Sequence, residues 1–124
     1  MASTRENGLG RIEISESVIA IIAGTAASEC YGLVGMASRN VQDGISEFLG
    51  WENLERGVQV YLHEGAVEIE LHIVVEYGVK ISEVAHNVME QVKYAVENSC
   101  GLEVLKVNVH VEGVRVRREN KRKR

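Results

Sequence analysis

The sequence has 124 residues, which is enough for one domain and too few for two. Its apolar content is 45% and its aromatic content 5%, so a core must be built mainly from aliphatic side chains. The net charge of −4 is unevenly divided: residues 115–124 hold seven basic residues and one acidic residue (+6), and the remainder holds seven basic and seventeen acidic residues (−10). An acidic body disfavours nucleic-acid binding, because neutralised phosphates supply most of that affinity.

Nothing in the sequence predicts a membrane span or an export signal. No apolar run reaches 18 residues, and the polar first ten residues lack the apolar segment of a signal peptide. Cys30 and Cys100 form no CxxC pair and are too few for a disulfide-stapled secreted domain. We therefore expect a cytoplasmic protein, peripheral to the membrane at most, whose cysteines pack as small apolar residues; a redox or disulfide role is the alternative.

The chain opens with a predicted strand and helix. Residues 11–14 alternate polar and apolar side chains, as in a short strand. Ser15 fits the N-cap of a helix over residues 16–30, and Gly32 is well placed as its left-handed C-cap.

The following segment predicts a loop and a short helix. Residues 31–40 are expected to form a loop packed against the body, and Asn40 fits the N-cap of the short helix. The apolar face of that helix comprises Val41, Ile45, Phe48 and Leu49, with Trp51 directly after it. We expect this face to cover the core; docking of a partner is the other interpretation.

The second half of the chain predicts a hairpin, a long helix and a last strand. Residues 58–63 and 67–76 alternate with a period of two on either side of a tight turn at Gly65. Residues 81–99 carry an apolar stripe at helical spacing, and residues 103–112 alternate again as a strand.

This order of elements predicts an α+β fold, a split β-α-β-β-α-β sandwich. One mainly antiparallel sheet of about four strands would carry two main helices on one face, plus the short extra helix, and leave its other face to water or a partner. The expected organisation is a flexible N-terminus over 1–10, a single domain over 11–116 and a basic tail over 117–124.

Three histidines and three glutamates of the last three strands share the outward sheet face: His63, His72, His110, Glu68, Glu70 and Glu112. Such groups suit zinc, but they lie on separate strands and show neither HxH nor HExxH spacing. We expect a solvated face and assign no metal ligand and no cofactor; a metal-dependent enzyme on this face is one alternative. Without a nucleophile elbow or a phosphate loop, no catalytic residue is assigned and the protein is predicted not to be an enzyme.

A second alternative is a small nucleic-acid-binding protein. Residues 32–35 (GLVG) have the GxxG form with which KH domains clamp a nucleic-acid backbone. The apolar insert and the acidic body argue against this use, and a helix stop followed by a turn explains both glycines. Nucleic acid is therefore not an expected partner.

The basic tail is the segment that we predict to bind an anionic partner. Its basic residues are Arg115, Arg117, Arg118, Lys121, Arg122, Lys123 and Arg124. Each basic residue near an anionic leaflet contributes ~1 kcal/mol, so the tail could hold the protein loosely at a membrane surface. An acidic protein or nucleic acid is another such partner, and a solvated end without any partner is the other interpretation.

Blocks along most of the chain carry a family resemblance. They are residues 10–15 (GRIEIS), 18–20 (VIA), 26–29 (AASE), 30–38 (CYGLVGMAS), 56–60 (RGVQV), 77–78 (YG), 80–88 (KISEVAHNV), 107–109 (VNV) and 113–116 (GVRV). In this order they resemble the alkaline shock protein family of Gram-positive bacteria, also called envelope stress response proteins, and in particular its YloU-like branch. The resemblance spans roughly residues 8–116 and leaves out the tail.

The resemblance implies a cytoplasmic protein without an established active site. It implies self-association, recruitment to the membrane by a small membrane-anchored protein, and a link to lipid metabolism. We therefore predict a non-enzymatic protein of envelope homeostasis and stress response, a binding or scaffold module on the cytoplasmic side of the membrane. The open sheet face and the ends of the last strand are the surfaces expected to bind further copies of the chain, since unpaired strand edges invite pairing.

Overall fold

The computed structural model describes residues 2–40, 45–50 and 54–116. In chain order the elements are β1 (Ala2–Asn7), β2 (Gly10–Ser15), α1 (Glu16–Ser28), β3 (Leu33–Asn40), β4 (Ile45–Gly50), the 3₁₀ helix η1 (Leu54–Gly57), β5 (Val58–His63), β6 (Ala66–Glu76), α2 (Ile81–Cys100) and β7 (Glu103–Arg115). Neither α-helix of the described chain combines the length and apolar content that crossing a bilayer requires.

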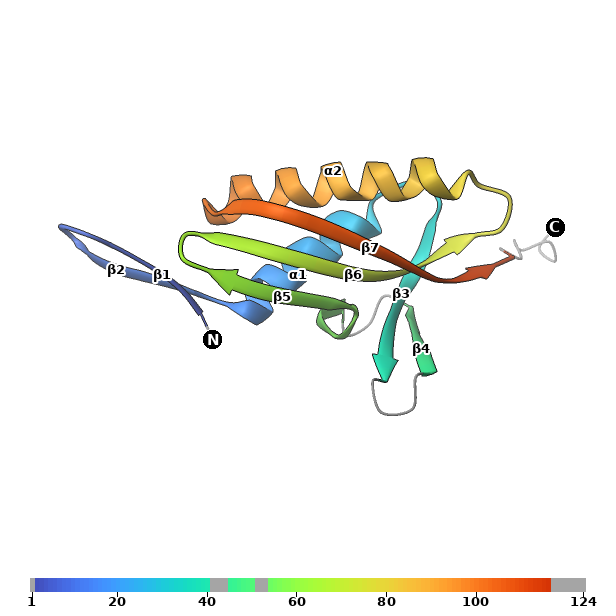
Figure 1. Ribbon diagram of the computed structural model, residues 1–124, viewed down its shortest axis with the longest axis horizontal. Helices are drawn as coiled ribbons and strands as arrows, with labels where there is room; N and C mark the ends of the chain where they lie inside the picture. Colours follow the sequence, from blue (N-terminus) through green and yellow to red (C-terminus); the bar gives the residue numbers. More distant parts are fainter. Residues whose placement is uncertain (1, 41–44, 51–53, 117–124) are drawn as a thin grey trace, which may run out of the picture.

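Strand β6 is the centre of the main sheet (Figure 1). Along one side it pairs antiparallel with β5 over Ala66 to Leu71 and with β3 over Ile73 to Val75. Along its other side it pairs in parallel with β7, after the crossover through α2. Strand β4 extends the sheet beyond β3. Strand β7 therefore forms one edge of the sheet, and its own outer edge meets no strand of the described chain.

Both helices cover the same face of this sheet, and the core between the layers is aliphatic. Alternate residues of β6, from Val67 to Val75, point into it and are fully buried. Against them α2 packs a stripe of Val84, Val88, Val92 and Val96, and α1 packs Ile19, Ala20, Ala23 and Ala27. The expected α+β class, with two main helices on one sheet face, is confirmed.

The limits of both helices follow local signals. The Ser15 hydroxyl accepts a hydrogen bond from the Val18 N–H at 3.3 Å, as an N-cap does, and Gly101 ends α2 with a positive φ of 71°. Helix α1 stops earlier than the sequence predicts, at Ser28, with Glu29 as its C-cap. Gly32 is therefore not the C-cap; its φ of +91° serves the turn into β3.

The predicted loop and short helix are wrong: the structure has the strands β3 and β4 there. Leu33 opposes Val75 and Met36 opposes Ile73 in the pairing of β3 with β6, and both β3 side chains are buried. In β4, the apolar residues Ile45, Phe48 and Leu49 have the spacing of a helix. The segment is nevertheless a strand, because its backbone forms hydrogen bonds with β3 in an antiparallel ladder. Val41 and Trp51 lie outside the described residues.

The strand predicted at the start of the chain does not join the main sheet. Strand β2 contains the predicted residues 11–14, but it pairs with β1 in a separate two-stranded hairpin that projects from one end of the molecule (Figure 1). The sequence predicts a flexible segment here rather than β1. The Asn7 side chain closes the turn by accepting the Leu9 and Gly10 N–H groups, and the Arg5 guanidinium donates to the Gly101 carbonyl at 2.6 Å.

Candidate functional site on the open sheet face

The sheet face opposite the helices carries the polar side chains of β5, β6 and β7. Because side chains alternate along a strand, the buried apolar row of β6 leaves Glu68, Glu70 and His72 on this other face. The parallel register with β7 then sets Glu70 beside Asn108 and His72 beside His110. The predicted common face is thus confirmed for Glu70, His72 and His110.

Within that face, Glu70, His72 and His110 form one cluster, called here the His–Glu cluster. One possible ligand atom from each of the three lies within 4.8 Å of the others. The two imidazole rings are stacked, with centroids 4.7 Å apart and an angle of 15° between planes. His110 Nε2 lies 3.0 Å from Glu70 Oε1, and the Asn108 amide donates to Glu70 Oε2 at 3.3 Å.

His72 is buried, although the sequence predicts a solvated face. Its exposed fraction is 6%, and its Nδ1 lies 2.7 Å from Glu112 Oε2, a carboxylate that is itself nearly buried. A register shift between Ile73 and Val74 makes Glu112 an extra residue of β7. This bulge accounts for a contact between residues that are not directly opposed. The other ring nitrogen of His72, Nε2, is buried without a hydrogen-bond partner in the described structure.

The six residues grouped from the sequence divide into two sets. His63 Nε2 lies 3.4 Å from Glu68 Oε1, and both belong to an exposed pair apart from the His–Glu cluster. Asn108 was missed, although it alternates with His110 and Glu112 along β7 as Glu70 and His72 do along β6. This alternation indicates which sheet face Asn108 lies on, but it does not reveal that Asn108 lies beside Glu70 of β6.

Of the basic residues predicted to bind an anionic partner, the structure describes Arg115. Its guanidinium carbon lies 4.0 Å from the centroid of the Phe48 ring, a cation–π contact that the sequence did not predict. The other six, from Arg117 to Arg124, lie outside the described residues, and their proposed role stays a prediction.

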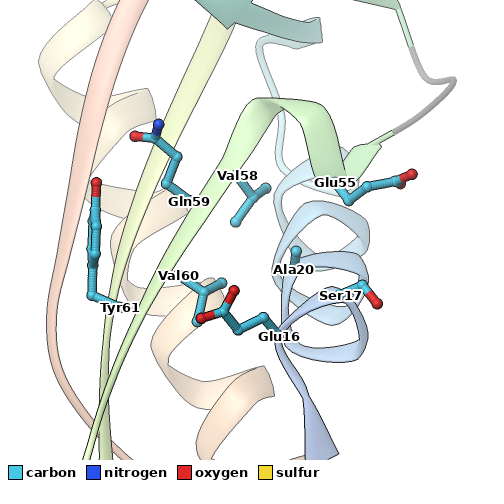
Figure 2. Close-up of a pocket in the computed structure, with 8 residues that line it drawn as sticks. All are labelled: Glu16, Ser17, Ala20, Glu55, Val58, Gln59, Val60 and Tyr61. Carbon is cyan, nitrogen blue, oxygen red and sulfur yellow. The ribbon is translucent and has the colours of Figure 1, made fainter. Parts of the chain in front are cut away.

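A hollow of about 410 Å³ lies between α1, η1 and β5 (Figure 2). Its polar groups come from Glu16, Ser17, Glu55, Gln59 and Tyr61, over a floor of Ala20, Val58 and Val60. No histidine, lysine or cysteine of the described chain lines it.

The remaining candidates from the sequence have structural roles. Residues 32–35 include the buried Leu33 and enter β3, so they do not form an exposed GxxG clamp. Cys30 and Cys100 are both free and buried, and burial raises the pKa of each thiol. Both pack in the apolar core, as the sequence predicts. The raised pKa keeps each thiol protonated, and a protonated thiol is a poor nucleophile.

Residues 4–116 match the alkaline shock protein 23 family, which is described as having a cell envelope-related function. The chain belongs to this family. The resemblance to alkaline shock proteins, and to their YloU-like branch, is confirmed.

Among its relatives, the chain is 55% identical over 108 residues to the uncharacterized protein YloU of Bacillus subtilis, with 86% of this chain and 90% of YloU covered. It is 41% identical over 112 residues to the uncharacterized protein Spy1614 of Streptococcus pyogenes, covering 90% and 93% of the two chains. Among solved structures, a zinc form of the MamM C-terminal domain aligns at a TM-score of 0.48 and 14% identity, covering 77% of this chain and 82% of that one.

Proposed function

We propose that this protein is a non-enzymatic binding or scaffold module of the cell envelope, acting on the cytoplasmic side of the membrane. Membership of a cell envelope-related family supports the cellular setting. The observation that carries the mode of action is strand β7, which is 13 residues long and pairs along one side alone in the described chain. An unpaired strand edge offers backbone donors and acceptors to a strand of another chain.

The surroundings of the β7 edge suit such a partner strand. Leu105 is 50% exposed, and with Met89, Lys93, Val104 and Val107 it lines a groove between α2 and β7. Register shifts at both ends of β7 bound the regular stretch between Lys106 and Val111. A strand added there would gain backbone hydrogen bonds along this stretch and an apolar contact at Leu105.

The occupant that we propose is a second copy of this chain. Two β7 strands related by a twofold axis through Val109 would pair antiparallel within this regular stretch, with Val107 opposite Val111 and Asn108 opposite His110. Apolar residues then oppose apolar ones and no like charges face each other, which is the pattern that favours cross-strand pairing.

Sedimentation of the purified full chain at micromolar concentration tests this proposal. We expect species of at least twice the 13.7 kDa chain mass, because the paired edges bury backbone groups that each monomer leaves to water. Leu105→Lys places a charge at the edge and should shift the chain towards the monomer. Tyr94→Lys, on a side chain of α2 that is 66% exposed, is the matched control and should leave the mass unchanged.

A monomer at every concentration, or an assembly that Leu105→Lys leaves intact, would contradict pairing through β7. Circular dichroism of both variants establishes that each one is folded.

A further inference from the structure

The His–Glu cluster contains an unexplained group, the buried Nε2 of His72. An ionised carboxylate accepts hydrogen bonds, so the 2.7 Å contact between Nδ1 and Glu112 assigns the proton of a neutral His72 to Nδ1. Nε2 then carries a lone pair, buried without a donor. Leaving a buried acceptor unsatisfied is destabilising, so such an atom is expected to have a partner that satisfies it.

The other members of the cluster supply further ligand atoms close to His72: one possible ligand atom from each of Glu70, His72 and His110 lies within 4.8 Å of the others. In the parallel pair of strands, Glu112 lies on the C-terminal side of the two rings and Glu70 on their N-terminal side. The Asn108 amide holds one oxygen of Glu70 and leaves the other, Oε1, beside His110 Nε2.

We propose that Glu70, His72 and His110 bind a divalent transition-metal ion of the zinc class, with Glu112 as the carboxylate that orients His72. Two imidazole nitrogens and one carboxylate oxygen form a ligand set that zinc uses when its fourth position stays open. A carboxylate that fixes the second nitrogen of a ligating histidine is the usual support for such a set. The carboxylate of Glu70 also gives the cluster a negative charge, which favours a cation over a neutral ligand.

The distances allow this with small movements. Ligand atoms of a tetrahedral zinc site lie about 3.3 Å apart, given bonds of about 2.0–2.1 Å, and the three atoms here already lie within 4.8 Å. The exposed ring of the stacked pair, that of His110, must turn so that the two lone pairs converge. His110 can do this because 45% of its side chain is exposed and the χ2 torsion of histidine is soft. The buried His72 can stay in place.

The test is calorimetric titration of zinc chloride into the full chain after treatment with a chelator. We expect one ion per chain, and at least about tenfold weaker binding for His110→Ala and for Glu70→Gln, each of which removes one ligand atom. Glu112→Gln should weaken binding by about 10–100-fold without removing a ligand, as the loss of an orienting carboxylate does.

His63→Ala is the matched control, because His63 is also an exposed histidine of this face beside a glutamate but lies outside the cluster. It should bind zinc as the unchanged chain does. Nitrogen-detected NMR of the imidazoles adds a readout of position: zinc should shift Nε2 of His72 and His110 and leave His63 unmoved.

Absence of stoichiometric binding would overturn the proposal. So would equal losses in His63→Ala and His110→Ala, which would indicate zinc held by scattered surface histidines. Thermal unfolding of each variant without metal shows whether it is folded, and His110→Ala leaves the core intact because His110 is exposed.

Discussion

At the scale of single residues, Gly32 sets how closely α2 approaches the turn before β3. Its φ of +91° lies in the left-handed region, and a Cβ added there would lie 2.8 Å from Val84 Cγ2. Val84 belongs to the buried stripe of α2, so it cannot move without disturbing the core. Gly78 has a similar φ of +98° but has open space where its Cβ would be.

We therefore expect Gly32→Ala to be more destabilising than Gly78→Ala. Both variants carry the backbone strain of an L-residue at positive φ, about 1–2 kcal/mol. Gly32→Ala adds overpacking against Val84, about 1–3 kcal/mol more. Urea unfolding of the two variants measures the difference, and equal losses of unfolding free energy would show that no steric contact limits Gly32.

At the scale of elements, the strands and helices that carry a clear period were predictable, and the segment from Leu33 to Gly50 was not. The hairpin β5–β6 and helix α2 have periods of two and 3.6 that match their burial. Strand β7 alternates in sequence, but Leu105, which alternation predicts to point inward, lies at a register shift and is exposed. The strand β4 instead carries apolar residues at helical spacing, and pairing with β3, which no local pattern reveals, decides its structure.

The candidate site shows the same division. Its residue types and their common face followed from alternation, because side-chain direction on a strand is local. Which histidine met which glutamate depended on the register of β6 with β7 and on the bulge at Glu112. Both are tertiary features, so the sequence placed His63 and His72 on one solvated face, where the structure separates an exposed pair from a buried imidazole.

Glu97 links the elements α2 and β7. Its carboxylate accepts from Lys93 Nζ at 2.7 Å and from the Val104 N–H at 3.1 Å. The bond from Lys93, and after it the bond from the Val104 backbone, lowers the pKa of Glu97. A carboxyl whose pKa is lower in the folded than in the unfolded chain stabilises the fold above its unfolded pKa, about 4.3, and loses this contribution as the pH falls through its folded pKa.

Glu97→Gln should accordingly lower the melting temperature at neutral pH by a small amount, since solvent screens this partly exposed pair. The difference from the unchanged chain should shrink as the pH falls through the lowered, folded-state pKa of Glu97, because the carboxyl then becomes protonated in the folded chain as well. Glu90→Gln is the control on the same helix, because Glu90 contacts His86 at 3.1 Å and no backbone group of β7. A difference that grows in acid, or an equal effect of Glu90→Gln, would contradict the role of Glu97.

At the scale of the whole molecule, the charge is divided between a body and a tail. Strand β7, the last element of the described chain, ends on the side of the molecule opposite the β1–β2 hairpin (Figure 1). Arg115 contacts the Phe48 ring and belongs to the body. The residues after Val116 include six basic residues and one acidic residue, which together carry a charge of +5. The acidic body should be repelled by an anionic membrane, so any contact with such a surface must come through this tail.

We expect the full chain to float with vesicles that contain anionic lipid and to stay unbound with zwitterionic vesicles. A chain that ends at Val116 should not float with either, because it lacks the charges that attract the anionic leaflet at about 1 kcal/mol each. A matched full-length variant with glutamine at the six basic positions beyond Val116 keeps the tail and loses its charge, so it should behave as the shortened chain does. Raising the salt well above about 0.15 M should release the unchanged protein, since screening shortens the reach of the charges. If the protein still floats at high salt, or if the glutamine variant floats, the membrane contact must lie on the body instead. The exposed apolar side chains of α1 and α2 would then be the next surface to substitute.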